Sequence, residues 1–257
     1  MIELANYIDG RLLPPHSGLY LDDINPATAD VFAKIPQSDS ADLELAITAA
    51  EKAQPCWSTI DVAQRAEYLN KISQLILENS DALIAAECED NGKPLWLAKT
   101  VDIPRAAANF KFFAEAITQF PSESYAMSSP AINYTLRKPV GIVGCISPWN
   151  LPLYLFTWKI APALAAGNCV IAKPSEVTPY SSFLLSEICQ QAGLPEGVLN
   201  LLHGEGNTIG RAIVAHEKIK AISFTGGTVT GQQIASIAAP MFKKLSLELG
   251  GKNATIV

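Results

Sequence analysis

Residues 140–176 read VGIVGCISPWNLPLYLFTWKIAPALAAGNCVIAKPSE. A short, β-branched apolar run at residues 140–146 predicts a buried strand rather than a helix. The polar turn Ser147-Pro148-Trp149-Asn150 ends that run, and a helical pattern follows over residues 153–166. A second apolar run then leads into another polar turn, Lys173-Pro174-Ser175-Glu176. Both turns fall at the carboxyl ends of the strands of a βαβ unit, where open α/β sheets bind their ligands, so the chemistry is expected there.

Strands and helices continue to alternate after this unit. Apolar runs predict strands at residues 198–202, 221–224 and 244–248, with a helical segment before each of them. Together with the βαβ unit this gives about five strands, and the alternation predicts an α/β fold with a Rossmann-like, doubly wound parallel sheet. The last run, residues 253–257, is also apolar and is interpreted as the start of a further strand.

Residues 1–139 are predicted to form a helical and hairpin-rich segment. Residues typical of turns occur in its first part, and helical patterns follow. Three carboxylates, Glu87, Glu89 and Asp90, lie just before Asn91-Gly92, which has the character of a helix C-cap. A cation site is one interpretation of this cluster, but the absence of converging ligands in the sequence favours a solvated helix end.

The composition is that of a folded, acidic chain. Hydrophobic residues make up 49% and charged residues 17% of the 257 residues, enough for a sizeable core. The net charge of -6 argues against a nucleic-acid partner, which needs a basic face. Five cysteines without a CxxC spacing indicate free thiols in a reducing, cytoplasmic setting, and three isolated histidines argue against a metal site. No signal peptide is readable, and polar residues interrupt the most apolar segment, so no membrane partner is expected.

Lys173 and Glu176 lie on the turn that follows the second strand, so both side chains can reach one ligand. A carboxylate in this place accepts hydrogen bonds from ribose hydroxyls and repels a 2′-phosphate. The alternative is a surface ion pair, which contributes little to stability. The spacing by itself favours neither interpretation.

Glycines follow two successive predicted strands further along the chain. The first set reads G-x-G-x-x-x-G, one residue longer than the dinucleotide fingerprint. The second set has the spacing of a P-loop, but Gln232-Gln233 replaces the Lys-Ser/Thr that would hold phosphate and metal. Such glycines let a flat or anionic ligand lie against the start of a helix, and the alternative is an ordinary tight turn. The two sets are Gly204, Gly206 and Gly210, and Gly226, Gly227 and Gly231.

Asn150 and Glu248 are polar residues at the ends of predicted strands. The side-chain amide of Asn150 can stabilise an oxyanion, although asparagine in this place is also typical of a helix N-cap. Glu248 ends the run that starts at Leu245 and precedes two glycines. It is interpreted either as a paired carboxylate at the edge of the core or as a general base in apolar surroundings.

Four short motifs occur in order: SPWN at 147–150, KPSE at 173–176, FTGGT at 224–228 and LELGGK at 247–252. In this order and spacing they resemble the aldehyde dehydrogenase superfamily, and the resemblance covers nearly the whole chain. ISPWNLPLYLFTWKIAPALAAGN and KKLSLELGGKN are most similar to the branch that oxidises 2-aminomuconic and 2-hydroxymuconic semialdehydes. Gly227 departs from the family pattern, since many members carry serine there. This change should keep the backbone cradle and remove one hydroxyl near the cofactor phosphates.

The resemblance implies a reaction and a set of site residues. The reaction is NAD-dependent oxidation of an aldehyde to a carboxylic acid, in which a cysteine thiolate attacks the aldehyde and water releases the acid from a thioester. Asn150 would donate its amide to the oxyanion, and Glu248 would be the general base. NAD is expected in preference to NADP because Glu176 would meet the ribose hydroxyls. The residues implied in cofactor binding are Ile146, Ser147, Pro148, Trp149, Lys173, Ser175, Glu176, Gly206, Gly210, Phe224, Thr225, Gly226, Gly227, Thr228, Gly231 and Leu249.

The family carries its nucleophilic cysteine downstream of LELGGK, and none of the five cysteines of this chain matches that motif. The resemblance therefore implies that residues 140–257 form the NAD-binding core, that residues 1–139 pack on it, and that the chain is a fragment without the catalytic domain. Full-length members act on small aldehydes and form homo-oligomers. The leading hypothesis is thus an oxidoreductase fragment, and the alternative is a nucleotide-binding module that never performs the oxidation.

Overall fold

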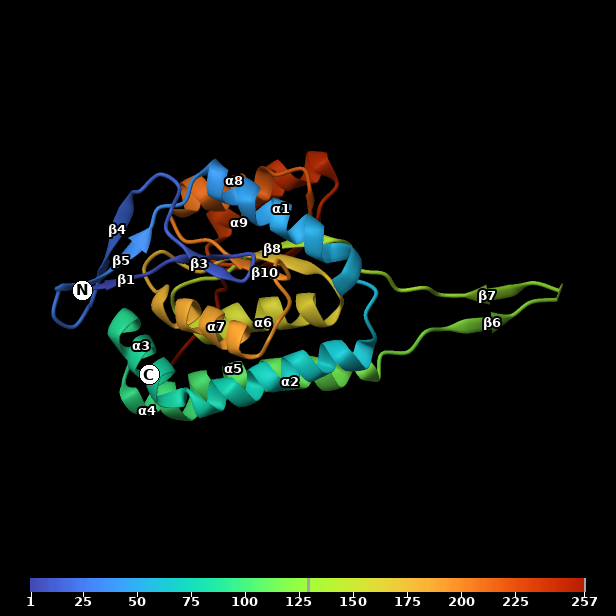
Figure 1. Ribbon diagram of the computed structural model, residues 1–257, viewed down its shortest axis with the longest axis horizontal. Helices are drawn as coiled ribbons and strands as arrows, with labels where there is room; N and C mark the ends of the chain where they lie inside the picture. The colour runs from blue at the N-terminus through green and yellow to red at the C-terminus, as the bar shows by residue number, and fades with distance from the viewer. Residues whose placement is uncertain (129, 257) are drawn as a thin grey trace.

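The computed structural model describes residues 1–128 and 130–256 of the chain. A seven-stranded sheet forms its centre, and a three-stranded sheet and a two-stranded hairpin flank it (Figure 1). The strands are β1 (Ile2–Glu3), β2 (Asn6–Ile8), β3 (Arg11–Leu13), β4 (Tyr20–Ile24), β5 (Val31–Pro36), β6 (Ser124–Ala126), β7 (Ile132–Tyr134), β8 (Ile142–Ile146), β9 (Cys169–Lys173), β10 (Leu199–Leu201), β11 (Ile219–Thr225) and β12 (Lys244–Glu248). The helices are α1 (Ser40–Trp57), α2 (Val62–Glu78), α3 (Ser80–Asn91), α4 (Leu95–Leu97), α5 (Ile103–Thr118), α6 (Pro152–Ala165), α7 (Tyr180–Gln191), α8 (Arg211–Ala215) and α9 (Thr228–Ala238), with the short helical turns η1 (Ala98–Asp102), η2 (Gly206–Gly210) and η3 (Ala239–Met241).

Five neighbouring strands of the large sheet, in the order β12-β11-β8-β9-β10, run parallel. The chain proceeds from β8 outward to β10 and then returns to build β11 and β12 on the other side of β8. The predicted α/β fold with a doubly wound parallel core is therefore confirmed. The reversal leaves a crevice at the carboxyl ends of β8 and β11, and such crevices are the usual ligand sites of these folds.

The sheet is mixed rather than purely parallel, because two N-terminal strands extend it beyond β10. β2 pairs antiparallel with β10, with Tyr7 opposite Leu201, and β3 pairs with β2. All three residues of β2 are buried, so this pairing satisfies backbone groups that have no access to water. The division of the chain at residue 139 stays a prediction, and both the sheet and the hydrophobic core run across that position.

Helices cover both faces of the sheet (Figure 1). α6 and α7 lie on one face, and α1, α8 and α9 lie on the other. α2 and α5 pack against the outer side of α6 as a further layer. Because both faces are covered, every residue of β8 and β9 is buried, which explains why these strands are continuous apolar runs in the sequence.

The carboxylates at the end of α3 do not form a solvated helix end, so that prediction is wrong. Glu87 and Asp90 are only 0% and 3% exposed. Glu87 pairs with Lys93, and Asp90 accepts a hydrogen bond from the backbone N–H of Tyr180. The prediction failed because α7, which comes much later in the chain, packs against α3 and covers these side chains.

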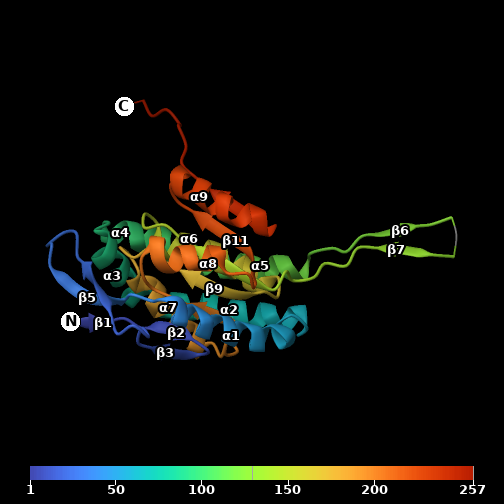
Figure 2. The ribbon, with the colours of Figure 1, turned by 90° about the horizontal axis from the view of Figure 1, so that it is seen from above.

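The chain also differs from the prediction near its last residues. The expected strand at residues 253–257 is absent from residues 253–256, which are exposed and have no regular secondary structure, and Val257 lies outside the described residues. The helix expected after β10 is divided into η2 and the short α8. The C-terminal residues after β12 leave the body of the molecule (Figure 2).

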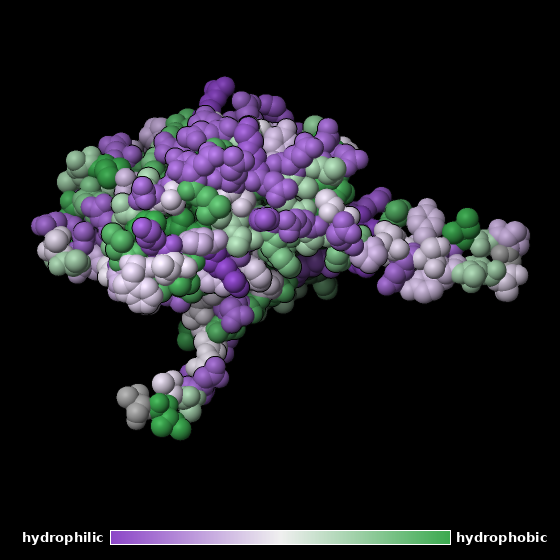
Figure 3. Space-filling model, turned by 90° about the horizontal axis from the view of Figure 1, so that it is seen from below, coloured by the Kyte–Doolittle hydropathy of each residue, from purple (hydrophilic) through white to green (hydrophobic). Residues whose placement is uncertain are grey.

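β6 and β7 pair antiparallel and project far from the body (Figures 1 and 2). Figure 3 shows the same extension as an arm with apolar side chains on its surface. Tyr125, Ile132 and Tyr134 of this arm are exposed. Within the described ranges, no helix combines the length and apolar character needed to cross a membrane.

Candidate functional site

Two adjoining grooves open at the carboxyl ends of β8, β9 and β11. The inner groove, of about 640 Å³, lies among the turns that follow β8 and β9, the η2 loop and the turn between β11 and α9. The outer groove, of about 920 Å³, lies among α6, the turn after β8 and strand β12. The two grooves share Pro148, Trp149, Thr225, Gly226 and Gly227, so one extended ligand can occupy both.

Most of the predicted cofactor residues line the inner groove. Thr228 and Gly231 do not line it, and Leu249 lines the outer groove instead. Glu205 and Arg211 also line the inner groove, and the motifs did not single them out. Their positions directly beside predicted glycines were the available signal. The predicted residues that do line it are Ile146, Ser147, Pro148, Trp149, Lys173, Ser175, Glu176, Gly206, Gly210, Phe224, Thr225, Gly226 and Gly227.

Lys173 and Glu176 form an ion pair at this groove, with 2.9 Å between Nζ and Oε2. The lysine side chain is 2% exposed and the glutamate side chain 36% exposed, so the pair extends from the interior to the groove surface. Glu176 Oε1 also accepts a hydrogen bond from the backbone N–H of Gly206 at 3.2 Å. The pair is therefore not an isolated surface contact: it fixes the carboxylate between the turn after β9 and the η2 loop.

The electrostatics of the pair keep the carboxylate charged. Burial lowers the pKa of Lys173, and the nearby charge of Glu176 opposes that effect. Burial acts to raise the pKa of Glu176, but Lys173 and the hydrogen bond from Gly206 outweigh it, and the pKa of Glu176 is lowered. An ionised carboxylate is purely an acceptor, so Glu176 is suited to hydroxyl groups of a ligand.

The turn between β11 and α9 presents free backbone amides. Gly227 is the N-cap of α9, and no side chain of the described residues caps the helix. A Cβ added at Gly227 would meet nothing within 4 Å, so the backbone borders open space. A Cβ added at Gly226 would lie 2.4 Å from Phe224 Cζ, so this position requires glycine. The first turn of an uncapped helix attracts an anion through its N–H groups and its dipole.

Gly231 and Leu249 support this turn from behind. A Cβ at Gly231 would lie 2.5 Å from Leu249 Cδ2, so α9 lies very close to the residue that follows β12. The backbone N–H of Gly226 also donates to the carbonyl of Glu248 at 3.0 Å. Gly231 thus allows α9 to pack closely against the end of β12.

Asn150 and Glu248 both line the outer groove. Asn150 is exposed, and Leu151 rather than Asn150 is the N-cap of α6, so the N-cap interpretation is wrong. Glu248 lies opposite Thr225 in the pairing of β11 with β12, and its side chain is exposed. Within the described part of the chain, Glu248 therefore lacks the apolar surroundings that were expected for it. The fold nonetheless brings an amide donor and a carboxylate to one cavity.

Lys159 is a groove residue that the motifs did not reveal. Its Nζ donates to Thr225 Oγ1 at 2.6 Å, and the side chain lines the outer groove. Burial lowers the pKa of Lys159, and the nearby carboxylate of Glu248 acts against that effect. A single lysine within the otherwise apolar α6 was the signal that could have indicated it.

Neither groove is lined by a cysteine of the described residues. Cys145 and Cys169 are buried in β8 and β9, and burial raises the pKa of each to about 12. Both thiols are therefore protonated near neutral pH and poorly accessible. All five cysteines are free.

Comparison with known protein families agrees with this geometry. The model described as "Aldehyde dehydrogenase family" matches residues 14–257 of the chain. The chain belongs to the aldehyde dehydrogenase family. This confirms the resemblance that the four ordered motifs indicated.

Relatives of this aldehyde dehydrogenase chain include enzymes named for muconic semialdehydes. The human 2-aminomuconic semialdehyde dehydrogenase is 46% identical over 258 residues, which cover 100% of this chain and 53% of that protein. The 2-hydroxymuconic semialdehyde dehydrogenase of Pseudomonas sp. is 44% identical and is matched over 100% of this chain and 54% of its own length. The chain thus spans about half the length of the curated relatives it matches.

Two solved aldehyde dehydrogenase relatives contain the dinucleotide. The NAD+ complex of aldehyde dehydrogenase from Bacillus cereus superposes with a TM-score of 0.95 at 38% identity, covering 97% of this chain and 51% of that one. PnpE from Pseudomonas sp. WBC-3, in complex with nicotinamide adenine dinucleotide, gives a TM-score of 0.95 at 37% identity, covering 98% of this chain and 52% of that one. Structural relatives of this aldehyde dehydrogenase chain therefore bind NAD+.

Proposed function

We propose that this chain binds NAD in the inner groove and contributes it, with Asn150 and Glu248, to the oxidation of an aldehyde to a carboxylic acid. The observation that carries the proposal is the junction of the two grooves. The surface shared around Trp149 and Gly226 joins a nucleotide-sized groove to a cavity that holds an amide donor and a carboxylate. NAD supplies the hydride acceptor for such an oxidation.

The residues of the inner groove fit the parts of a dinucleotide. The ionised carboxylate of Glu176 accepts hydrogen bonds from ribose hydroxyls, and Lys173 holds that carboxylate in place. The open backbone at Gly227 and the uncapped start of α9 suit the pyrophosphate. NAD is favoured over NADP, because a 2′-phosphate would approach the negative charge of Glu176.

Asn150 and Glu248 take complementary roles in the outer groove. The amide of Asn150 donates to the oxygen that becomes negative when the aldehyde is attacked. Glu248 withdraws a proton from the water that releases the acid. The attacking thiol comes from outside the two grooves of this chain, whose described lining contains no cysteine.

A muconic-type semialdehyde is the substrate class that we propose. The relatives at 46% and 44% identity carry the names of such enzymes. The outer groove is lined by Phe113, Tyr154 and Trp158, flat aromatic side chains that can stack on a conjugated, planar carbon chain.

We also propose that residues 140–257 form the cofactor-binding core and that the protein carrying them assembles as a homo-oligomer through exposed apolar surfaces such as the β6–β7 arm.

Isothermal titration calorimetry tests the cofactor site directly. The parent chain should bind NAD more tightly than NADP, and Glu176→Gln should narrow that difference because it removes the charge and keeps the shape of the side chain. Glu123→Gln, on the exposed arm far from the groove, is the matched control and should leave both affinities unchanged. Equal affinities of the parent chain for NAD and NADP would contradict the role assigned to Glu176.

A second candidate function is a nucleotide-binding module that performs no oxidation. The observation that favours it is the absence of a cysteine from the described lining of both grooves. The two candidates are separated by adding a semialdehyde and NAD to the protein that carries this chain and following NADH absorbance. Turnover that falls with Glu248→Gln supports the enzyme, and NAD binding without any turnover supports the module.

A further inference from the structure

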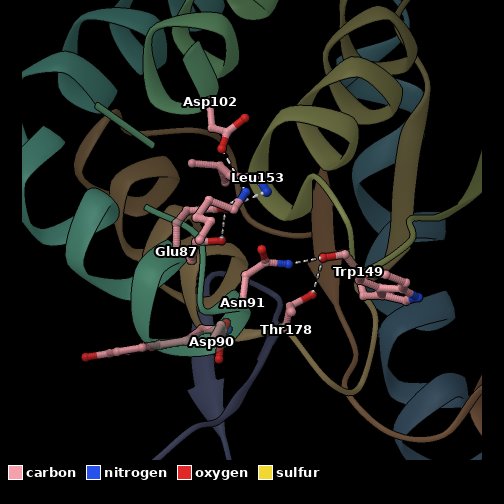
Figure 4. A network of polar contacts seen from close by, with 10 residues as sticks. Glu87, Asp90, Asn91, Asp102, Trp149, Leu153 and Thr178 are labelled. Carbon is pink, nitrogen blue, oxygen red and sulfur yellow. Dashed lines mark hydrogen bonds and ion pairs between the residues drawn. The ribbon is translucent and has the colours of Figure 1, made fainter. Parts of the chain in front are cut away.

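The last residue of α3 contacts the turn that carries Asn150 (Figure 4). The side-chain amide of Asn91 donates to the backbone carbonyl of Trp149 at 2.8 Å. Thr178 Oγ1 donates to the same carbonyl at 3.5 Å, a much longer contact. Asn91 is therefore the main hydrogen-bond donor to the residue that directly precedes Asn150.

The other end of the same turn is held by Glu87, one helical turn earlier in α3. Glu87 Oε1 accepts from the backbone N–H of Leu153 at 2.8 Å and from Ser181 Oγ at 2.7 Å. Leu153 is the second residue of α6, and the N-cap residue Leu151 has no side chain that could cap the helix. The buried carboxylate of Glu87 thus satisfies an amide at the N-terminus of α6 and complements its dipole.

Glu87 is itself fixed by a buried lysine. Lys93 Nζ lies 2.9 Å from Glu87 Oε2 and 2.7 Å from Asp102 Oδ2, and all three side chains are almost fully buried. Figure 4 shows Glu87 and Asp102 above the Asn91–Trp149 contact. α3 therefore presents a rigid edge, with one contact to the turn before Asn150 and another after it.

We propose that Asn91 is a positioning residue: it holds the Trp149 carbonyl so that Asn150 presents its amide to the outer groove. This inference rests on the proposed role of Asn150. The Asn91 bond is the shorter of the two to this carbonyl, and Asn150 is exposed and makes no side-chain hydrogen bond of its own within the described part of the chain, so its placement depends on how the turn is held. A small displacement of a group that contacts the reacting atoms has a large kinetic effect.

Asn91 is a better probe of this arrangement than Glu87. Asn91 is half-buried, so its replacement leaves no large cavity, whereas Glu87 is completely buried and its loss would disturb the fold. Asn91→Asp keeps the shape of the side chain and removes the donor. Asn91→Ala removes both. Asn70→Asp makes the same chemical change at an exposed position on α2 and is the matched control.

Hydrogen exchange measured by mass spectrometry on the peptide that spans residues 147–153 tests the contact without any need for turnover. Both Asn91 variants should accelerate exchange at the Leu153 amide, which donates to Glu87, by about fivefold, because a turn that is no longer held at the Trp149 carbonyl opens more often. NAD affinity and the melting temperature should stay close to those of the parent. Exchange at the Leu153 amide that is as slow in Asn91→Asp as in Asn70→Asp overturns the proposal.

A double-mutant cycle on aldehyde-dependent NADH formation, in the protein that carries this chain, provides the second readout. Asn91→Asp should lower kcat on the order of tenfold and leave the KM for NAD unchanged. The same change in an Asn150→Ala background should have almost no further effect, because Asn91 acts through Asn150. Fully additive effects on kcat overturn the positioning role. If the parent protein produces no NADH at all, the proposed function fails, and the exchange experiment still decides whether Asn91 holds the turn.

Discussion

Replacing Lys93 by methionine should destabilise the chain far more than replacing a surface lysine. Lys93 Nζ lies 2.9 Å from Glu87 Oε2 and 2.7 Å from Asp102 Oδ2, and the three side chains are 4%, 0% and 0% exposed. Methionine fills a similar volume but leaves two carboxylates buried without a counter-charge. Breaking a buried ion pair in this way costs about 3–5 kcal/mol.

The contacts indicate which carboxylate accounts for most of that loss. Glu87 retains its hydrogen bonds from Leu153 N–H and Ser181 Oγ when Lys93 is absent. Asp102 does not, since its Oδ1 has no partner among the described residues and its Oδ2 is bound by Lys93. Adding Asp102→Asn to Lys93→Met should therefore recover part of the lost stability, because a neutral amide is easier to bury than a charge.

Urea unfolding followed by circular dichroism measures these free energies, with the slope m as the check on two-state behaviour. Lys111→Met is the matched control, because the Lys111–Glu115 pair spans 3.9 Å and its side chains are 65% and 64% exposed. The control should change the free energy of unfolding by less than about 0.5 kcal/mol. A loss below about 1 kcal/mol in Lys93→Met, with m unchanged, would refute the reasoning that the buried network stabilises this region.

Three further predictions concern pH, the glycine turn and activity. Burial acts to lower the pKa of Lys93, but its two carboxylate partners outweigh burial and raise it. The difference in free energy of unfolding between the parent and Lys93→Met should therefore be fully present at neutral pH and decline only above about pH 10.4. Urea titrations at several pH values check this, and a decline of that difference near neutral pH would contradict it. Gly226→Ala should weaken NAD binding about tenfold, because its Cβ would lie 2.4 Å from Phe224 Cζ, while Gly227→Ala should be tolerated because its Cβ meets nothing within 4 Å. Calorimetry distinguishes the two variants, and equal losses of NAD affinity would be inconsistent with this turn geometry. The 257-residue chain alone should form no NADH from semialdehydes, because its five cysteines match no catalytic motif; steady NADH formation by the pure chain would argue against the proposed division of roles.

The sequence by itself determined the strands, helices and turns of the central unit. β8, α6 and β9 lie close to their predicted positions because a β-branched apolar run, a helical period and a Gly-Asn stop are local signals. The presence of the later strands β10, β11 and β12 followed from the same alternation. The inner groove was predictable for this reason, since turns at the carboxyl ends of neighbouring parallel strands meet at one edge of the sheet.

Only the tertiary structure decided the state of the charged residues. Glu87, Glu89 and Asp90 read as one polar cluster, yet α7 buries two of them by contacts from Tyr180 and Ser181, which are about ninety residues away along the chain. A local pattern carries no information about which distant helix will cover it. The same reason explains the missed contact of Lys159 with Thr225, which joins α6 to the end of β11.

The edge strands of the sheet also depend on pairing between segments that lie far apart in the sequence. β2 joins β10 through Tyr7 and Leu201, and nothing in either short segment specifies its partner. Glu248 has exposed surroundings because β12 is the edge strand, with only β11 beside it in the described chain. The local sequence thus fixed where the candidate groove residues stand along the chain. The packing of distant elements decided which of them are buried, charged and held in place, because burial and pairing depend on neighbours that the local sequence does not contain.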